Sequence, residues 1–169
     1  FSGSLAMGCA IWSMHFIGMS ALILPVTTGH DLVLTAISIL PAIIASYIAI
    51  LFIERDNYGA IYLTAGGICL GAGIGAMHYI GMEAMTGSFI LVYELGTFLL
   101  SIIVAVVLAV FALYIGQFNL ENDKKSYSLS ISAALIGAAI TGMHYMGMQA
   151  SFFLNVPIAH DVMHHSSHD

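Results

Sequence analysis

Long apolar stretches separated by short polar breaks make up most of the chain. Five such stretches cover residues 4–24, 32–53, 60–85, 95–116 and 128–154. Each is close to or above the roughly 20 residues with which a helix crosses the hydrocarbon core of a bilayer. Because the breaks are short, consecutive helices should be antiparallel neighbours. The pattern predicts an all-α, polytopic transmembrane bundle of about five helices, with a kink at Pro41 in the second.

The composition supports lipid as the solvent for most of the surface. Of the 169 residues, 60% are hydrophobic and 7% are charged, whereas a soluble domain has about 25% charged residues. Nine acidic and three basic residues give a net charge of −6, which argues against nucleic acid as a partner. Cys9 and Cys69 are expected to be small buried apolar residues. The sequence contains no evident pair of nucleophile and base, so we do not expect an enzyme.

The basic residues predict the orientation of the helices. Arg55, Lys124 and Lys125 fall in the second and fourth breaks, and the other breaks contain none. Short loops rich in Lys and Arg stay in the cytoplasm. The first, third and fifth helices should therefore run outward.

A six-residue motif occurs once in every second predicted helix. The copies read Met-His-Phe-Ile-Gly-Met from residue 14, Met-His-Tyr-Ile-Gly-Met from residue 77 and Met-His-Tyr-Met-Gly-Met from residue 143. The histidines His15, His78 and His144 are 63 and 66 residues apart. A helical hairpin is thus used twice and begun a third time, in repeats of about 1–57, 64–120 and 130–161. Repeats that run in the same direction predict pseudo-rotational symmetry about the membrane normal.

The third repeat is expected to continue beyond this chain, which looks like part of a domain of six to seven helices. The membrane domain itself is assigned to residues 1–155. Residues 156–169 form a His-rich polar tail or external loop. We expect this tail to be disordered, with surface metal capture by His160, His164 and His168 as the alternative.

The spacing within the motif predicts a shared site. Each His and the Met four residues later lie on one face of a helix. Each His lies roughly ten residues, or about 15 Å, from the outer end of its helix. A His at this depth needs an interior partner, and three at matching depth favour a common site. The candidate ligands with fixed positions are Met14, His15, Met19, Met77, His78, Met82, Met143, His144 and Met148.

Glycines also keep fixed offsets from each His, at positions −7 and +3. We expect them to let the backbone of a neighbouring helix come close. The remaining methionines are interpreted as core filler: Met7, Met85, Met146 and Met163.

Imidazole and thioether together form a soft ligand set that suits copper better than other common metals. Zinc would be expected to use Cys or carboxylates with His, and hard cations prefer oxygen. Haem held by two of the histidines is the main alternative. Copper transport is another, although the second and fourth apolar stretches contain neither Met nor His.

The three motif copies resemble those of the MHYT family of bacterial membrane sensor domains, named for Met-His-Tyr-Thr. The resemblance covers Gly3 to about Asp161, although the Thr is absent from every copy. It implies a multi-pass protein of the bacterial cytoplasmic (inner) membrane that binds copper, as Cu(I) or Cu(II), through Met, His and Tyr. It adds Tyr79 and Tyr145 as ligands, whereas Phe16 offers no phenol. It also implies sensing of a diatomic gas (O2, CO or NO) and a cytoplasmic signalling output module.

Acidic residues mark the outer ends of the helices. Asp31, Glu94 and Asp161 stand at loop-to-helix junctions, where we expect them to cap the following helix. A role at an external vestibule is the alternative. Glu83 follows Met82 directly. It is either a proton or metal partner of the site or a solvated residue at the interface.

Overall fold

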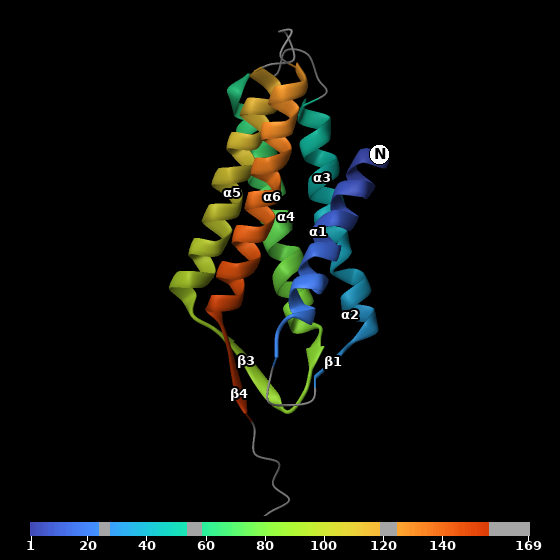
Figure 1. The fold of residues 1–169 in the computed structure, drawn as a ribbon, viewed down its shortest axis with the longest axis vertical. Helices are drawn as coiled ribbons and strands as arrows, with labels where there is room; N and C mark the ends of the chain where they lie inside the picture. The colour runs from blue at the N-terminus through green and yellow to red at the C-terminus, as the bar shows by residue number, and fades with distance from the viewer. Residues whose placement is uncertain (24–27, 54–58, 119–124, 156–169) are drawn as a thin grey trace, which may run out of the picture.

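The computed structural model describes residues 1–23, 28–53, 59–118 and 125–155 as a bundle of helices with two small sheets at one end (Figure 1). The all-α bundle is confirmed. The helices are α1 (Ser2–Ser20), α2 (Leu32–Ile37), α3 (Ile39–Ile53), α4 (Ala60–Glu83), α5 (Leu95–Phe118) and α6 (Lys125–Ala150). The strands are β1 (Gly29–His30), β2 (Met85–Thr86), β3 (Phe89–Tyr93) and β4 (Ser151–Asn155).

Four segments of the described chain are long and apolar enough to cross a membrane. They are Leu32–Phe52, Ala60–Glu83, Leu95–Gln117 and Leu129–Ala150. The chain is therefore a multi-pass membrane protein. The first predicted crossing corresponds to α1, which has 19 residues and packs along α3. α1 is richer in Gly and Ser than these four segments and is therefore less apolar. Its crossing of the membrane stays a prediction.

Two helix boundaries differ from the predicted stretches. The second stretch breaks at Ser38, between α2 and α3, and not at Pro41 itself. Proline removes the N–H that would bond the carbonyl four residues earlier and its ring clashes with that carbonyl, so the distortion lies before the proline. The fifth stretch was predicted to continue to residue 154, but α6 ends at Ala150 and β4 follows. Short sheets of this kind were not predicted.

The sheets tie successive repeats together at the end opposite the predicted cytoplasmic breaks (Figure 1). β1 pairs with β2, and β3 pairs with β4, both antiparallel. The backbone N–H of Asp31 donates to the Ala84 carbonyl, and that of Glu94 donates to the Ala150 carbonyl, both at 2.8 Å. The Asp31 carboxylate also accepts from the N–H groups of Val33 and Leu34, so the predicted cap of α2 is confirmed.

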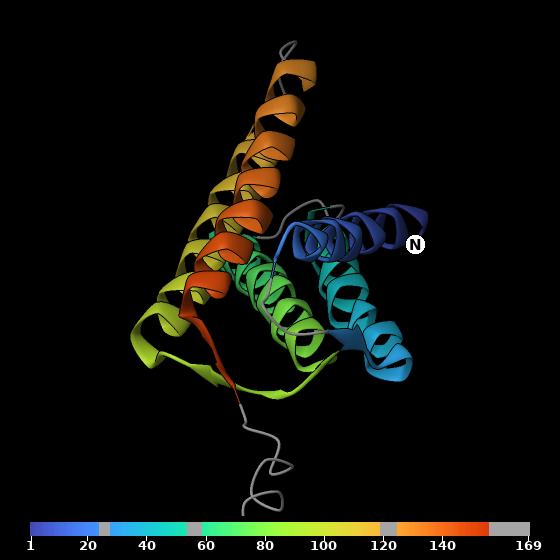
Figure 2. The ribbon, with the colours of Figure 1, turned by 60° about the horizontal axis from the view of Figure 1, so that its bottom comes forward.

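The motif helices α1, α4 and α6 face one another, while α3 packs between α1 and α4 and α5 packs between α4 and α6 (Figure 2). Glycines permit these contacts, as predicted for the −7 position. A methyl group on Gly8 would lie 2.9 Å from the backbone of Ile43, and one on Gly71 would lie 2.5 Å from that of Val106. At Gly137, the equivalent position of α6, nothing lies within 4 Å.

Candidate metal centre

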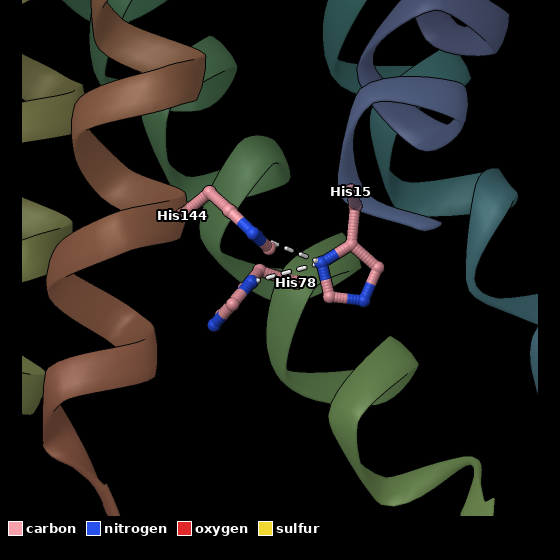
Figure 3. A group of neighbouring side chains, drawn as sticks. All are labelled: His15, His78 and His144. Atoms are coloured by element: carbon pink, nitrogen blue, oxygen red, sulfur yellow. Dashed lines mark hydrogen bonds between the residues drawn. The ribbon is translucent and has the colours of Figure 1, made fainter. Parts of the chain in front are cut away.

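The three motif histidines meet at the centre of the bundle, one from each motif helix (Figure 3). The Nδ1 atom of His15 lies 3.0 Å from Nδ1 of His78 and 3.3 Å from Nδ1 of His144. All three ligand atoms lie within 4.8 Å of one another, and all three side chains are buried. The sequence prediction of a common site is therefore matched by a direct contact between residues 63 and 129 positions apart.

The centre lies nearer to the outer helix ends than predicted. His15 and His78 are each five residues from the ends of their helices at Ser20 and Glu83, and His144 is six residues from Ala150. Five residues of helix rise about 8 Å, roughly half the predicted depth. The prediction overestimated the depth because it counted residues of the loops and of β4 as helix.

The glycine three residues after each His receives the imidazole of another repeat. A methyl group on Gly81 would lie 2.5 Å from Nε2 of His15, and one on Gly18 would lie 2.5 Å from Nε2 of His144. A methyl group on Gly147 would collide with Nε2 of His78 in the same way. The contacts form a closed cycle from α1 to α4 to α6 and back to α1. These glycines therefore seat a side chain, and not the backbone of a neighbouring helix as predicted.

Apolar layers enclose the histidines along the axis of the bundle. Residues four apart share a helix face, and Ile11, His15 and Met19 are all buried on α1. The same stripe on α4 has Ile74, His78 and Met82, which are also buried.

The remaining predicted methionine ligands differ in their surroundings. Met77 and Met143 belong to the hydrophobic core around the isoleucines, and Met14 packs against it. Met148 is half-buried. The structure therefore brings the histidines into contact, while Met19 and Met82 lie one turn outward of them.

The hydroxyl groups of the two tyrosines predicted as ligands differ in their surroundings. The Tyr79 hydroxyl makes a 2.8 Å hydrogen bond with Ser101 on α5. Tyr145 is 64% exposed, and its hydroxyl has no partner among the described residues. In the first repeat, where Phe16 has no hydroxyl, the Trp12 indole N–H donates to Ser38 instead, at 3.1 Å. The aromatic residues of the first two repeats thus tie a motif helix to the following helix of its hairpin.

The donor set suits a soft or borderline cation. Each Nδ1 carries one proton or one lone pair, so the His15 nitrogen makes one good hydrogen bond and not two. A metal with bonds of about 2.0 Å and tetrahedral geometry spaces its ligands by about 3.3 Å, close to the observed separations. The three rings turn Nδ1 toward one another, whereas Nε2 of His15 and Nε2 of His78 are buried, each against a glycine of another motif helix. The residues therefore fit a copper ion bound through Nδ1.

Glu83 does not reach this centre. Its side chain is exposed, and it accepts a 3.1 Å hydrogen bond from the Tyr93 hydroxyl. Burial and the neighbouring carboxylate raise the pKa of Tyr93. Glu83 is thus a solvated residue at the interface and not a partner of the site. Cys9 was expected to be buried but is exposed, and Cys69 is half-buried.

A groove of about 480 Å³ between α1 and α6 reaches the centre from the side. It is lined by Ala10, Ser13, Met14, Ile17, Gly18, Thr141, His144 and Tyr145. Because His144 lines this groove, it is the most accessible of the three histidines, at 4% exposure against 0% for His15.

A multi-pass bundle with three converging histidines defines a membrane sensory module of the kind found in bacterial signalling proteins. The chain belongs to the MHYT family, whose profile is described as the N-terminal repeat of bacterial signalling proteins. That profile matches residues 8–65 and 71–126, which overlap the first two predicted repeats. The predicted resemblance is confirmed.

Three bacterial relatives cover nearly the whole chain. The bifunctional diguanylate cyclase/cyclic di-GMP phosphodiesterase MucR of Pseudomonas aeruginosa is 40% identical over 152 residues, 89% of this chain and 22% of MucR. The cyclic di-GMP phosphodiesterase NbdA of the same organism is 34% identical over 157 residues, 92% of this chain and 20% of NbdA. The signaling protein YkoW of Bacillus subtilis is 37% identical over 155 residues, 89% of this chain and 19% of YkoW.

The chain therefore spans about a fifth of the length of these relatives. Their enzymatic names describe the longer proteins. No solved structure matches the chain.

Proposed function

We propose that His15, His78 and His144 bind copper and that the chain senses a diatomic gas (O2, CO or NO) at this site in the bacterial cytoplasmic membrane. The observation that carries the proposal is the convergence of three buried Nδ1 atoms at 3.0 and 3.3 Å. Three buried imidazoles at this spacing form a ligand set that copper accepts. A copper ion held there would supply an open coordination position for the gas.

The protein residues around the site would convert occupancy into a change of helix packing. Each imidazole packs against a glycine of another motif helix. A ring that changes position therefore pushes on that helix. Met19 and Met82 cover the histidines on the outer side. Thioethers bind copper less firmly than imidazole does, so these methionines are the expected hinges and the histidines the expected anchors. Packed helices respond in small discrete steps.

The names of the relatives suggest where the signal goes. MucR and NbdA are named for turnover of cyclic di-GMP. We therefore include in the proposal a cytoplasmic output module of this kind in the protein to which the chain belongs.

Metal analysis of the purified protein tests the proposal. The wild type should retain copper, and His78→Ala and His144→Ala should lose it. Met82→Leu should keep copper and change its response to gas. The optical spectrum under reducing conditions, with and without CO or NO, reports that response. Met7→Leu is a matched control for Met82→Leu, because Met7 lies about two helical turns before His15 on α1.

Three other outcomes would contradict the proposal. A haem Soret band in place of copper would assign the histidines to haem. Copper that is insensitive to CO, NO and O2 would favour copper handling over sensing. Loss of copper on deletion of residues 156–169 would place the metal in the tail, whose structure lies outside the described residues.

A further inference from the structure

A pair of soft ligands, one imidazole and one thioether, lies outside the three-histidine centre, where β1 pairs with β2. His30 is the cross-strand partner of Met85. Because Asp31 donates its N–H to the Ala84 carbonyl, residues 31 and 84 form a hydrogen-bonded pair. Pair types alternate along an antiparallel ladder, so His30 and Met85 form the more closely spaced kind. Their side chains share one face, with Cβ atoms about 5 Å apart.

This pair is connected to the centre by direct contacts. The His30 ring lies 5.9 Å from the Phe16 ring, which lies 4.8 Å from the ring of His15. The Phe16 ring therefore lies between the imidazoles of His30 and His15. Met19 is buried one turn outward of His15. His30 itself is exposed, and Met85 is half-buried.

The second repeat has the same contact between aromatic rings but lacks the two soft ligands. The residues equivalent to Phe16 and His30 are Tyr79 and Tyr93, whose rings make the same contact at 5.2 Å. The cross-strand partner of Tyr93 is Ser151, and the Tyr93 hydroxyl bonds to Glu83. Both repeats thus place an aromatic ring here, but only β1 and β2 combine imidazole with thioether.

We propose that His30 and Met85 form an entry site that captures Cu(I) from the outer face and passes it to the three-histidine centre. The inference rests on the proposed function. The two soft ligands of the pair should bind Cu(I) more weakly than the three imidazoles of the centre, with Met19 and Met82 beside them. Cu(I) released from the pair is therefore retained at the centre. Because His30 is exposed, the pair can exchange metal quickly, as a transfer site requires.

Loading kinetics test the entry site. Purified protein receives Cu(I) from a chromophoric chelator, and the rate of transfer is followed optically. His30→Tyr reproduces the residue of the second repeat and keeps the ring contact, and Met85→Leu keeps the volume. Each should slow loading by about tenfold. The final copper content, measured after gel filtration has removed weakly held metal, should be unchanged. Tyr93→Phe, the matched control at the equivalent position, should load at the wild-type rate.

Unchanged rates in both variants would overturn the entry site, and so would a reduced final copper content, because the residues would then belong to the centre itself. A silver titration separates this inference from the proposed function. His78→Ala should still bind one weakly held Ag(I), and the double variant with His30→Tyr should bind one fewer. Equal silver binding by both variants would overturn the entry pair, whatever the centre does. A silver difference in a protein whose wild type holds no copper would sustain the pair and reject the centre.

Discussion

The second and third repeats place their motif helices in different surroundings. α4 has its hairpin partner α5 beside it, so Gly71 meets the backbone of Val106 and the Tyr79 hydroxyl meets Ser101. α6 has no such neighbour among the described residues on its equivalent face. There, Gly137 has nothing within 4 Å and Tyr145 is 64% exposed. Nearly the same sequence thus lies in a filled position in one repeat and beside an open groove in the other.

The difference shows which features depend on the outer helix and which do not. The histidine seats are present in all three repeats, although the third outer position is open. Within the part of the chain that the structure describes, the centre is therefore built by α1, α4 and α6. The outer helices support the motif helices from behind, through small residues and hydroxyl contacts such as those of Ser38 and Ser101. Paired substitutions at equivalent positions can separate these roles.

Leucine at Gly71 should have the largest effect. Its Cβ would lie 2.5 Å from the Val106 Cα, and backbone atoms cannot yield as a side chain can. We expect a loss of about 3 kcal/mol or more of stability. Gly137→Leu should be neutral or slightly stabilising, because leucine favours helix by up to about 1 kcal/mol over glycine. Thermal unfolding in detergent measures both. Equal destabilisation would mean that another segment covers Gly137.

Alanine at the histidine seats should mainly affect the metal. In Gly81→Ala the new methyl group displaces the His15 ring, since the obstructing atom is Nε2 at 2.5 Å. Copper affinity should fall by about 10- to 100-fold, as for other residues that orient a ligand. Gly18→Ala should cost less, because His144 lines the groove and its ring can turn into it. Competition with a copper chelator gives both values, and a larger loss in Gly18→Ala would contradict the cycle.

Removal of the tyrosine hydroxyls should produce a smaller and unequal change. Tyr79→Phe loses the 2.8 Å bond to Ser101 and should lower stability by about 1 kcal/mol. Tyr145→Phe should leave stability unchanged, because its hydroxyl is exposed. Both variants should keep copper if the three histidines alone hold it. Loss of the copper optical signal in either variant would restore tyrosine as a ligand.

Loss of the Glu94 cap of α5 should have the smallest effect on stability, and the size of this effect should depend on pH. Hydrogen bonds from the Thr97 side chain, the Thr97 N–H and the Gly96 N–H hold the pKa of Glu94 below its ordinary value of 4.5. The ionised cap therefore stabilises the fold above about pH 4.5, and this contribution is lost as the pH falls through the lower folded pKa. The difference in Tm between wild type and Glu94→Ala should shrink on acidification. A difference that grows at low pH would have the wrong sign.

Local patterns explain which parts of the fold could be predicted. Apolar length identifies the membrane helices because lipid requires it. The capping roles of Asp31 and Glu94 depend only on residues two and three positions away. Short strands such as β3 are too weakly marked, because their pairing partner β4 is distant in sequence. For the same reason the apolar stretch past Ala150 was assigned to helix.

The sequence by itself determined that this protein crosses a membrane, that it repeats a helical hairpin and that three histidines lie at one level. Each of these follows from spacing along the chain, which helix geometry converts directly into depth and face. Only the tertiary structure decided which neighbours those residues meet. The +3 glycines seat the imidazole of another repeat, the Tyr79 hydroxyl turns to α5, and His30 comes beside Met85. Such contacts depend on how helices rotate and pair in space, and this information is not contained in the periodicity of any one segment.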